Sequence, residues 1–193
     1  MRVFDFDNTI YDGESSIDFA FYMIRNFRKI ILYIPMILFS LAGYKMCIMS
    51  REKLESVINR FFAGVMEQTE KTEIFVNRFW EKNARKLNRS MLELIRPEDI
   101  IISASPIFLF GGIRGVLNTE NIIGTDVDFE RKRITWLNFG ENKLKRYREM
   151  YGDKRIDMLF TDSYNDKDLM MISRKIFIVK KGVIVKRLVP KKR

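Results

Sequence analysis

The pattern of apolar residues changes along this chain of 193 residues, and that change limits the folds available to it. Residues 2–6 form a short apolar, strand-like segment that ends in a polar turn. From residue 16 to about residue 95 the apolar spacing is helical, and few glycines or prolines interrupt it. After Pro97, strand-like runs alternate with helical segments. This order predicts an α/β fold: a Rossmann-like parallel sheet core with an α-helical cap inserted after the first strand.

Two amphipathic helices are expected within the insertion. The first follows a candidate N-cap at Ser50 and carries apolar residues at helical spacing from Leu54 to Phe62. The second is longer and aligns its apolar residues along one side: Phe75, Phe79, Trp80, Ala84, Leu87, Met91 and Ile95. Because apolar residues at helical spacing are usually buried, we interpret these aromatic side chains as core packing.

The second half of the chain predicts the rest of the sheet. Ile100–Ile102 is typical of a central parallel strand, and the Ser-Ala-Ser-Pro after it is typical of a functional loop. Further elements are expected at 142–151 (helix), 158–160 (strand), 167–172 (helix), and 176–179 with 183–185 (terminal hairpin). We therefore expect an α/β core formed by residues 1–12 and 96–193, and an inserted helical cap formed by residues 13–95.

Composition excludes several kinds of chemistry. The chain has no histidine, so an imidazole base and a histidine metal ligand are both excluded. A single cysteine, Cys47, excludes an internal disulfide and a multi-cysteine zinc site. Carboxylates must therefore carry any acid–base chemistry.

Charge and the first residues indicate the partners and the compartment. The formal net charge of +10 favours anionic partners, namely phosphorylated metabolites, nucleic acid or an anionic membrane surface, or it reflects only a solvated basic surface. No nucleic-acid-binding motif is found, so a specific nucleic acid partner is not expected. The first ten residues lack the apolar stretch of a signal peptide, so a cytoplasmic location is expected. The oligomeric state is left open.

Four polar clusters stand where strands are expected to end or where a helix is expected to begin. They are Asp5 to Thr9, Ser103 to Ser105, Lys143, and Asp162 to Asp166. Since the carboxyl ends of parallel strands meet at one edge of a sheet, we expect these clusters in one pocket. Several carboxylates with a hydroxyl and an ammonium suit a hydrated Mg²⁺ and a phosphate. Taken singly, the same residues also fit a helix cap, a loop hydrogen bond and solvated charges.

The four clusters occur in the order found in a known family. They read Asp5-Phe-Asp-Asn-Thr9, Ile-Ile-Ser103, Asn-Lys143 and Asp162-Ser-Tyr-Asn-Asp166, with a helical insertion after the first. In this the chain resembles the haloacid-dehalogenase-like phosphatases, in the branch that includes phosphoserine phosphatase. The resemblance implies hydrolysis of a phosphomonoester through an aspartyl-phosphate. It implies that Asp5 is the nucleophile, and that Asp7 protonates the leaving oxygen and later activates water.

The resemblance also implies a Mg²⁺ site. Asp5 and Asp162 would bind the ion through their carboxylates, and Asp7 through its backbone carbonyl. Asp166 would complete or orient this set of ligands.

Contacts to the substrate are implied in the same way. Ser103 and Lys143 would contact the phosphoryl oxygens, where charge must be stabilised in the transition state. Further substrate-binding positions are Asn8, Thr9, Glu14 and Ala104. Glu14 falls where phosphoserine phosphatase-like proteins place a carboxylate for the substrate's amino group. The Ser-Ala-Ser that begins at Ser103 departs from the Ser-Gly-Gly of that enzyme, which puts amino-acid specificity in doubt.

Residues 30–44 form an uncharged, apolar run between basic residues. As a helix the run would be about 22 Å long, shorter than the roughly 30 Å hydrocarbon core of a bilayer. A single crossing would also separate Asp5 from Asp162. A buried cap hairpin, an oligomer contact and a segment lying in one leaflet remain, and we favour the last. The run resembles the caps of phosphatidylglycerophosphate phosphatases, which implies a lipid phosphate substrate at the membrane; a soluble metabolite is the alternative.

Overall fold

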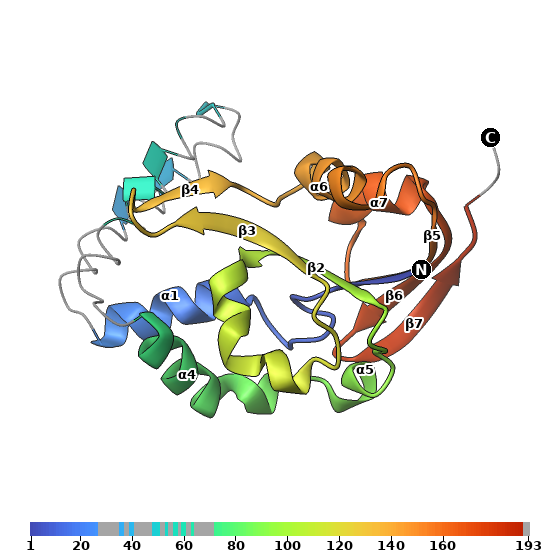
Figure 1. The fold of residues 1–193 in the computed structure, drawn as a ribbon, viewed down its shortest axis with the longest axis horizontal. Coiled ribbons are helices and arrows are strands. Elements are labelled where there is room, and N and C mark those ends of the chain that lie inside the picture. The colour runs from blue at the N-terminus through green and yellow to red at the C-terminus, as the bar shows by residue number, and fades with distance from the viewer. Residues whose placement is uncertain are drawn as a thin grey trace.

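The computed structural model of the chain describes residues 1–26, 35–36, 39–40, 48–50, 53, 56–57, 59–60, 63 and 72–190. Their strands form one seven-stranded sheet in the order β4-β3-β2-β1-β5-β6-β7 (Figure 1). The inner strands are parallel: β1 (Arg2–Asp5), β2 (Ile100–Pro106), β3 (Ile122–Asp128), β5 (Ile156–Thr161) and β6 (Ser173–Lys180). The antiparallel edges are β4 (Arg133–Trp136) and β7 (Val183–Leu188). The predicted α/β fold with a mainly parallel, Rossmann-like sheet is confirmed.

Helices cover both faces of this sheet. Alternate residues of β1 point to opposite faces, so Val3 joins one apolar cluster and Phe4 the other. The Val3 side is covered by α6 (Glu141–Tyr151) and α7 (Lys167–Met171), which lie together in Figure 1. The Phe4 side is covered by α1 (Ser15–Asn26), α4 (Thr72–Asn83) and the 3-10 segment η3 (Ile107–Val116).

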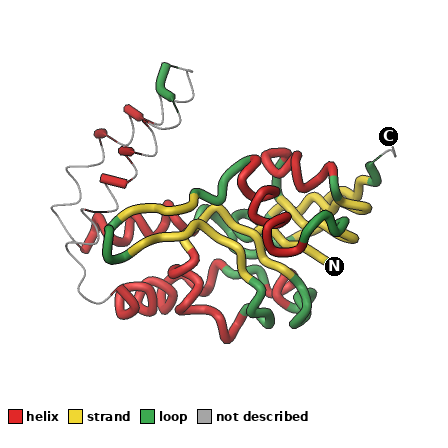
Figure 2. The backbone as a smooth tube through the Cα atoms, turned by 45° about the horizontal axis from the view of Figure 1, so that its top comes forward, coloured by secondary structure: helices red, strands yellow, loops and turns green. Residues whose placement is uncertain are grey.

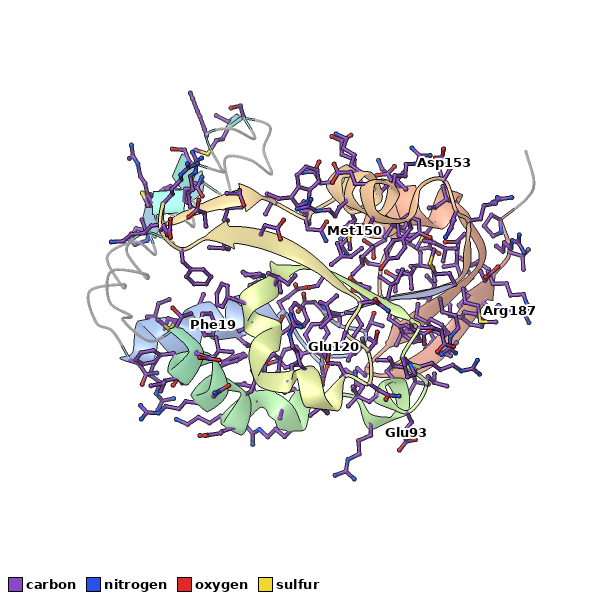
Figure 3. The ribbon with its side chains drawn as sticks, in the orientation of Figure 1. Phe19, Glu93, Glu120, Met150, Asp153 and Arg187 are labelled. Atoms are coloured by element: carbon purple, nitrogen blue, oxygen red, sulfur yellow. The ribbon has the colours of Figure 1, made fainter. Side chains whose placement is uncertain are left out.

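The Phe4 side is rich in aromatic side chains, which fill the space between α1, α4 and η3 (Figure 3). The Phe19 ring meets the Phe79 ring edge to face, with centroids 5.3 Å apart. The Trp80 indole N–H donates to the carbonyl of Leu109 at 2.6 Å, which ties α4 to η3. The interpretation of Phe79 and Trp80 as core residues is confirmed.

The long helix expected from Phe75 to Ile95 is interrupted in the structure. It consists of α4, a 3-10 turn η2 (Ala84–Lys86) and the short helix α5 (Arg89–Leu92). Leu87 between them is extended, with φ −71° and ψ 127°. The interruption follows from hydrogen bonds to the segment after β1, because Asp12 N donates to Lys86 O and Asn88 N to Ile10 O, both at 2.8 Å. These tertiary bonds replace the helical ones, although the apolar spacing continues.

The two connections between the insertion and the sheet are therefore joined to each other. We call this pairing, formed by residues 9–12 and 86–88, the joint. Tyr11 and Leu87 form an antiparallel bridge there, and the Asn88 side chain donates to Thr9 O at 2.9 Å. Asp18 of α1 accepts from the Tyr11 hydroxyl at 2.6 Å and from the Lys86 ammonium at 2.7 Å. The base of the insertion is thus held by bonds from both connections.

The C-terminal hairpin was correctly predicted. Its turn is Lys181-Gly182, and both residues have positive φ, 49° and 73°, as a type I′ hairpin turn requires.

Strand β2 is longer than expected, because the Ser-Ala-Ser-Pro expected as a loop continues the strand to Pro106. The β3–β4 hairpin was not predicted, and Figure 2 shows its two strands as long yellow tubes that extend away from the rest of the sheet. Ile134 N of this hairpin donates to the Asn59 side chain of the insertion at 2.7 Å.

Much of the insertion lies outside the described residues, including most of the apolar run at 30–44 and, from the expected helix, Leu54, Ile58, Phe61 and Phe62. Ser50 accepts from Lys53 N at 3.4 Å, as expected of an N-cap, and residues 53, 56–57 and 59–60 are helical. No helix among the residues that the structure describes is long and apolar enough to cross a membrane.

Candidate active site

A small pocket of about 90 Å³ opens at the carboxyl ends of β1, β2 and β5. Most of the residues singled out in the sequence line it: Asp5, Asp7, Glu14, Ala104, Lys143, Asp162 and Asp166. Its wall also includes Ser163 and Asn165 of the Asp162–Asp166 cluster, and Phe139 and Gly140, which the sequence analysis did not single out. Asn8, Thr9 and Ser103 do not line it. The sheet thus brings the four sequence clusters to one edge, as the topology of parallel strands requires.

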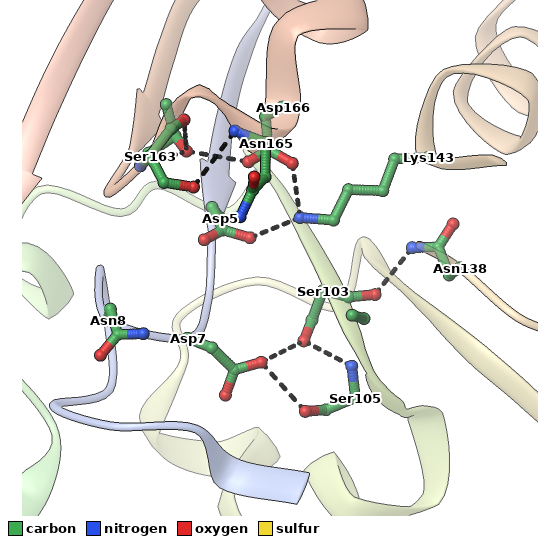
Figure 4. A network of polar contacts seen from close by, with 12 residues as sticks. Asp5, Asp7, Asn8, Ser103, Ser105, Asn138, Lys143, Ser163, Asn165 and Asp166 are labelled. Atoms are coloured by element: carbon green, nitrogen blue, oxygen red, sulfur yellow. Dashed lines mark hydrogen bonds and ion pairs between the residues drawn. The ribbon is translucent and has the colours of Figure 1, made fainter. Parts of the chain in front are cut away.

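Lys143 is the centre of the charged network in this pocket (Figure 4). Its ammonium donates to Asp5 Oδ1 at 2.7 Å and to Asp166 Oδ1 at 2.8 Å. Gly140, with φ 58°, ends the preceding loop and starts α6, which directs Lys143 into the pocket. Burial disfavours the ammonium, but Asp5 and Asp166 together outweigh it and raise the pKa of Lys143. Asp166 is also fixed by the Thr161 hydroxyl at 2.8 Å.

The carboxylates exceed the positive charge available to them. Burial raises the pKa of Asp5 well above its usual value, although Lys143 opposes this, and Asp166 raises it further. The pKa of Asp162 is raised by burial and then by Asp166, and that of Glu14 by burial and then by Asp7. The pocket therefore holds more negative charge than one lysine neutralises.

This excess bears on whether the residues fit a metal ion. Carboxylate oxygens are hard donors of the kind that Mg²⁺ prefers, and a divalent cation would relieve their repulsion. No three acidic side chains of the described residues stand as a ready-made metal site, and the Lys143 ammonium bonds to both Asp5 and Asp166. The donor set thus fits Mg²⁺ in its chemistry, whereas binding requires the carboxylates to rearrange around the ion.

Asp7 faces a group of serines instead of Lys143. Its Oδ1 accepts from Ser15 N at 2.6 Å, and its Oδ2 accepts from the hydroxyls of Ser103 and Ser105, both at 3.0 Å (Figure 4). The three serines are fully buried. Ser103 therefore contacts Asp7 in this structure, where the sequence analysis expected it on the phosphoryl group.

The remaining predicted substrate residues have different surroundings. The Asn8 amide donates to Glu14 Oε1 at 2.7 Å, and Asn8 takes a left-handed conformation with φ 57° that Asn tolerates well. The Thr9 side chain is fully buried, and its hydroxyl has no hydrogen-bond partner. Thr9 therefore does not line the pocket, whereas Glu14 and Ala104 form part of its wall.

Two polar residues that the sequence analysis missed hold β2 in place. The Asn138 amide donates to Ser103 O at 2.7 Å, and the Thr125 hydroxyl donates to Ala104 O at 2.6 Å. Asn138 N in turn donates to the Thr125 hydroxyl at 3.1 Å. Ser105 could have been found by its i+2 spacing from Ser103, which puts both on one face of a strand. No local signal marks Asn138.

The β2 strand is irregular where it carries the serines, and Gly124 makes room for it. The register with β3 shifts between Ile102 and Pro106. A Cβ at Gly124 would lie 2.8 Å from Ser105 O, closer than atoms can approach without movement.

We therefore expect Gly124→Ala to lower the free energy of unfolding by about 1–3 kcal/mol, as overpacking usually does. Denaturant unfolding measures this change. Gly115→Ala is the matched control, because a Cβ there meets nothing within 4 Å. Equal stability of the two variants would contradict the expected clash.

Comparison with known proteins is consistent with this architecture. A search of curated proteins finds no match. A solved structure of a protein of unknown function from Bordetella pertussis aligns with a TM-score of 0.71 at 17% identity, over 89% of this chain and 85% of that one. A phosphoserine phosphohydrolase-like protein from Francisella tularensis aligns with a TM-score of 0.58 at 16% identity, over 95% of this chain and 89% of that one. At these identities the likeness shows the fold alone.

The family model provides the assignment. The model of the haloacid dehalogenase-like hydrolases matches residues 3–171, a range that includes the pocket residues from Asp5 to Asp166. The match covers well over half of the chain. The chain belongs to the haloacid dehalogenase-like hydrolases.

Proposed function

We propose that the protein is a Mg²⁺-dependent phosphomonoester hydrolase that works through an aspartyl-phosphate on Asp5. The observation that carries the proposal is the Asp5 carboxylate at 2.7 Å from the Lys143 ammonium, in a small pocket that other carboxylates line. A nucleophile beside a buried cation suits attack on an anionic phosphoryl group, because the cation attracts the substrate and stabilises charge in the transition state.

The two half-reactions assign a task to each side chain. Lys143 engages Asp5 Oδ1, so we assign attack on phosphorus to Oδ2. As that bond forms, the bond from phosphorus to the ester oxygen breaks, and Asp7 donates a proton to the leaving oxygen. Asp7 then takes a proton from water, the water oxygen bonds to phosphorus, and the bond to Asp5 breaks to release phosphate. Lys143, with Ser103 once its hydroxyl turns from Asp7, would bind the phosphoryl oxygens.

The metal ion has a defined place in this scheme. Asp5, Asp162 and the backbone carbonyl of Asp7 would hold Mg²⁺, and Asp166 would complete or orient the ligands. When bound, Mg²⁺ would supply charge that neutralises the phosphoryl oxygens.

Measurement of phosphate release in Mg²⁺ tests the proposed reaction. The panel should contain phospho-amino acids, sugar phosphates, nucleotides and lipid phosphates in micelles. We expect hydrolysis of at least one class. Hydrolysis of none would contradict the proposed reaction.

Two substrate classes follow from the features of the insertion, which we propose acts as a cap formed by residues 13–95 on a core of residues 1–12 and 96–193. A lipid phosphate such as phosphatidylglycerophosphate is supported by exposed apolar side chains there, with Phe39 79% and Ile48 75% exposed. The protein would then be cytoplasmic and peripheral on an anionic membrane, with its net charge of +10 adding attraction. A soluble phosphate such as phosphoserine is supported by Glu14 in the pocket wall.

Vesicle binding separates these classes. We expect retention on anionic liposomes at low salt that weakens as salt screens the charges, and weakens further in Phe39→Asp, because that ring would enter the interface. Met171→Asp is the control, since Met171 is 65% exposed but lies on α7, outside the insertion. Co-sedimentation measures the bound fraction. No retention at low salt, or equal loss in both variants, would favour the soluble substrate.

A further inference from the structure

The carboxylate of Asp7 stands at the end of a chain of buried hydroxyl groups. Ser105 Oγ lies 3.0 Å from Asp7 Oδ2, and Ser15 Oγ lies 2.9 Å from Ser105 Oγ. Ser103 Oγ makes a second contact with the same oxygen of Asp7 and accepts from Ser105 N at 2.9 Å. All three serines are fully buried, so water does not compete for these bonds.

In the ionised form of Asp7, counting protons fixes the direction of the chain. A carboxylate can only accept, so the one proton of the Ser105 hydroxyl is then used on Asp7. The contact between the two serine hydroxyls must then be a donation from Ser15 to Ser105. The order Ser15 to Ser105 to Asp7 is the arrangement in which every donor has an acceptor.

The chain connects two parts of the molecule. Ser15 is the first residue of α1, whereas Ser105 lies in the irregular part of β2. Ser15 also donates its backbone N–H to Asp7 Oδ1 at 2.6 Å. Both carboxylate oxygens of Asp7 are thereby fixed, one from each element, which leaves the side chain one orientation.

We propose that Ser15 and Ser105 are positioning residues that hold Asp7 for proton transfer to the leaving oxygen. This rests on the role of Asp7 in the proposed function. Neither serine touches the substrate in this scheme, because neither lines the pocket. Each acts through Asp7. The absence of a Cβ at Gly124 leaves room for the irregular part of β2, which carries Ser105 to Asp7.

The proposal has a consequence that a purely structural role lacks. Proton donation accelerates departure of an alkoxide, which is a poor leaving group, but adds little for a nitrophenolate, which leaves without a proton. Loss of the Ser105 hydroxyl should therefore affect the two kinds of ester unequally. The ratio kcat/KM is the proper measure, because it reports steps up to formation of the aspartyl-phosphate and not its hydrolysis.

The experiment compares Ser105→Ala with wild type on p-nitrophenyl phosphate and on the alkyl phosphomonoester that the panel shows to be cleaved fastest. We expect kcat/KM for the alkyl ester to fall at least about tenfold, and for the aryl ester to stay within about twofold. Ser15→Ala keeps the backbone N–H bond to Asp7, so it should lower kcat/KM for the alkyl ester relative to the aryl ester by a smaller factor. This variant tests the proposal if Ser105→Ala does not fold. Ser173→Ala is the control, since it removes a buried hydroxyl that bonds to Leu169 O at 2.7 Å.

Equal losses on both esters, or no loss on either, would overturn the positioning role. If the wild-type protein cleaves neither ester, the proposed function is overturned, and the positioning role with it. The two failures are distinguishable, because the first requires an active wild-type enzyme.

Discussion

Replacement of Asp5 by asparagine is expected to reduce turnover at least about a thousandfold, because the amide cannot attack phosphorus. The fold should survive. Burial raises the pKa of Asp5 above its value in the unfolded chain, so this group lowers the stability of the fold increasingly as the pH rises from the ordinary range of an aspartate toward the raised pKa. An uncharged asparagine removes that penalty, and Lys143 keeps its bond to Asp166.

Steady-state phosphate release and thermal unfolding of the metal-free protein measure the two effects. We expect a melting temperature equal to or above that of wild type, alongside the lost turnover. Asp12→Asn is the control, because Asp12 is an exposed carboxylate in the segment that follows β1. Turnover like that of wild type in Asp5→Asn would refute its assignment as nucleophile.

Removal of divalent cations by EDTA is expected to abolish turnover, and added Mg²⁺ to restore it. Mg²⁺ should also raise the melting temperature, because it binds the crowded carboxylates of the folded pocket and not the unfolded chain. Asp162→Asn should increase the Mg²⁺ concentration needed for half-maximal activity. Asp153→Asn is the control, since Asp153 lies just beyond the end of α6 with its side chain 92% exposed (Figure 3). Activity that survives chelation would contradict the metal role.

Features with a local physical cause were predictable from the sequence. The end of β1 at Asp5 follows from an apolar run that meets polar residues, and the β6–β7 hairpin follows from a turn at Gly182 that needs positive φ. The approach of Asp5 to Asp166 follows from the parallel strands β1 and β5, which end at one edge, whereas Lys143 reaches both carboxylates from the start of α6.

Features that depend on distant partners were not predictable in the same way. The apolar spacing continues through Leu87, yet the backbone hydrogen bonds that join Lys86 to Asp12 and Asn88 to Ile10 interrupt the helix there. The β3–β4 hairpin mixes polar and apolar residues without clear alternation. The contact between Ser103 and Asp7 depends on the irregular β2 strand, which no local pattern specifies. The interfacial role of residues 30–44 stays a prediction.

The joint has a consequence for how proteins of this architecture can vary. Because Tyr11 and Leu87 are paired, the chain leaves the sheet and returns to it at one point, so the insertion is topologically a single long loop with pinned ends. The entropy of closing a loop grows only with the logarithm of its length, about 0.6 kcal/mol for each doubling. Residues can therefore be gained or lost beyond α1 and α4 with little effect on the catalytic sheet. The stability of the sheet then sets little limit on the size of the insertion.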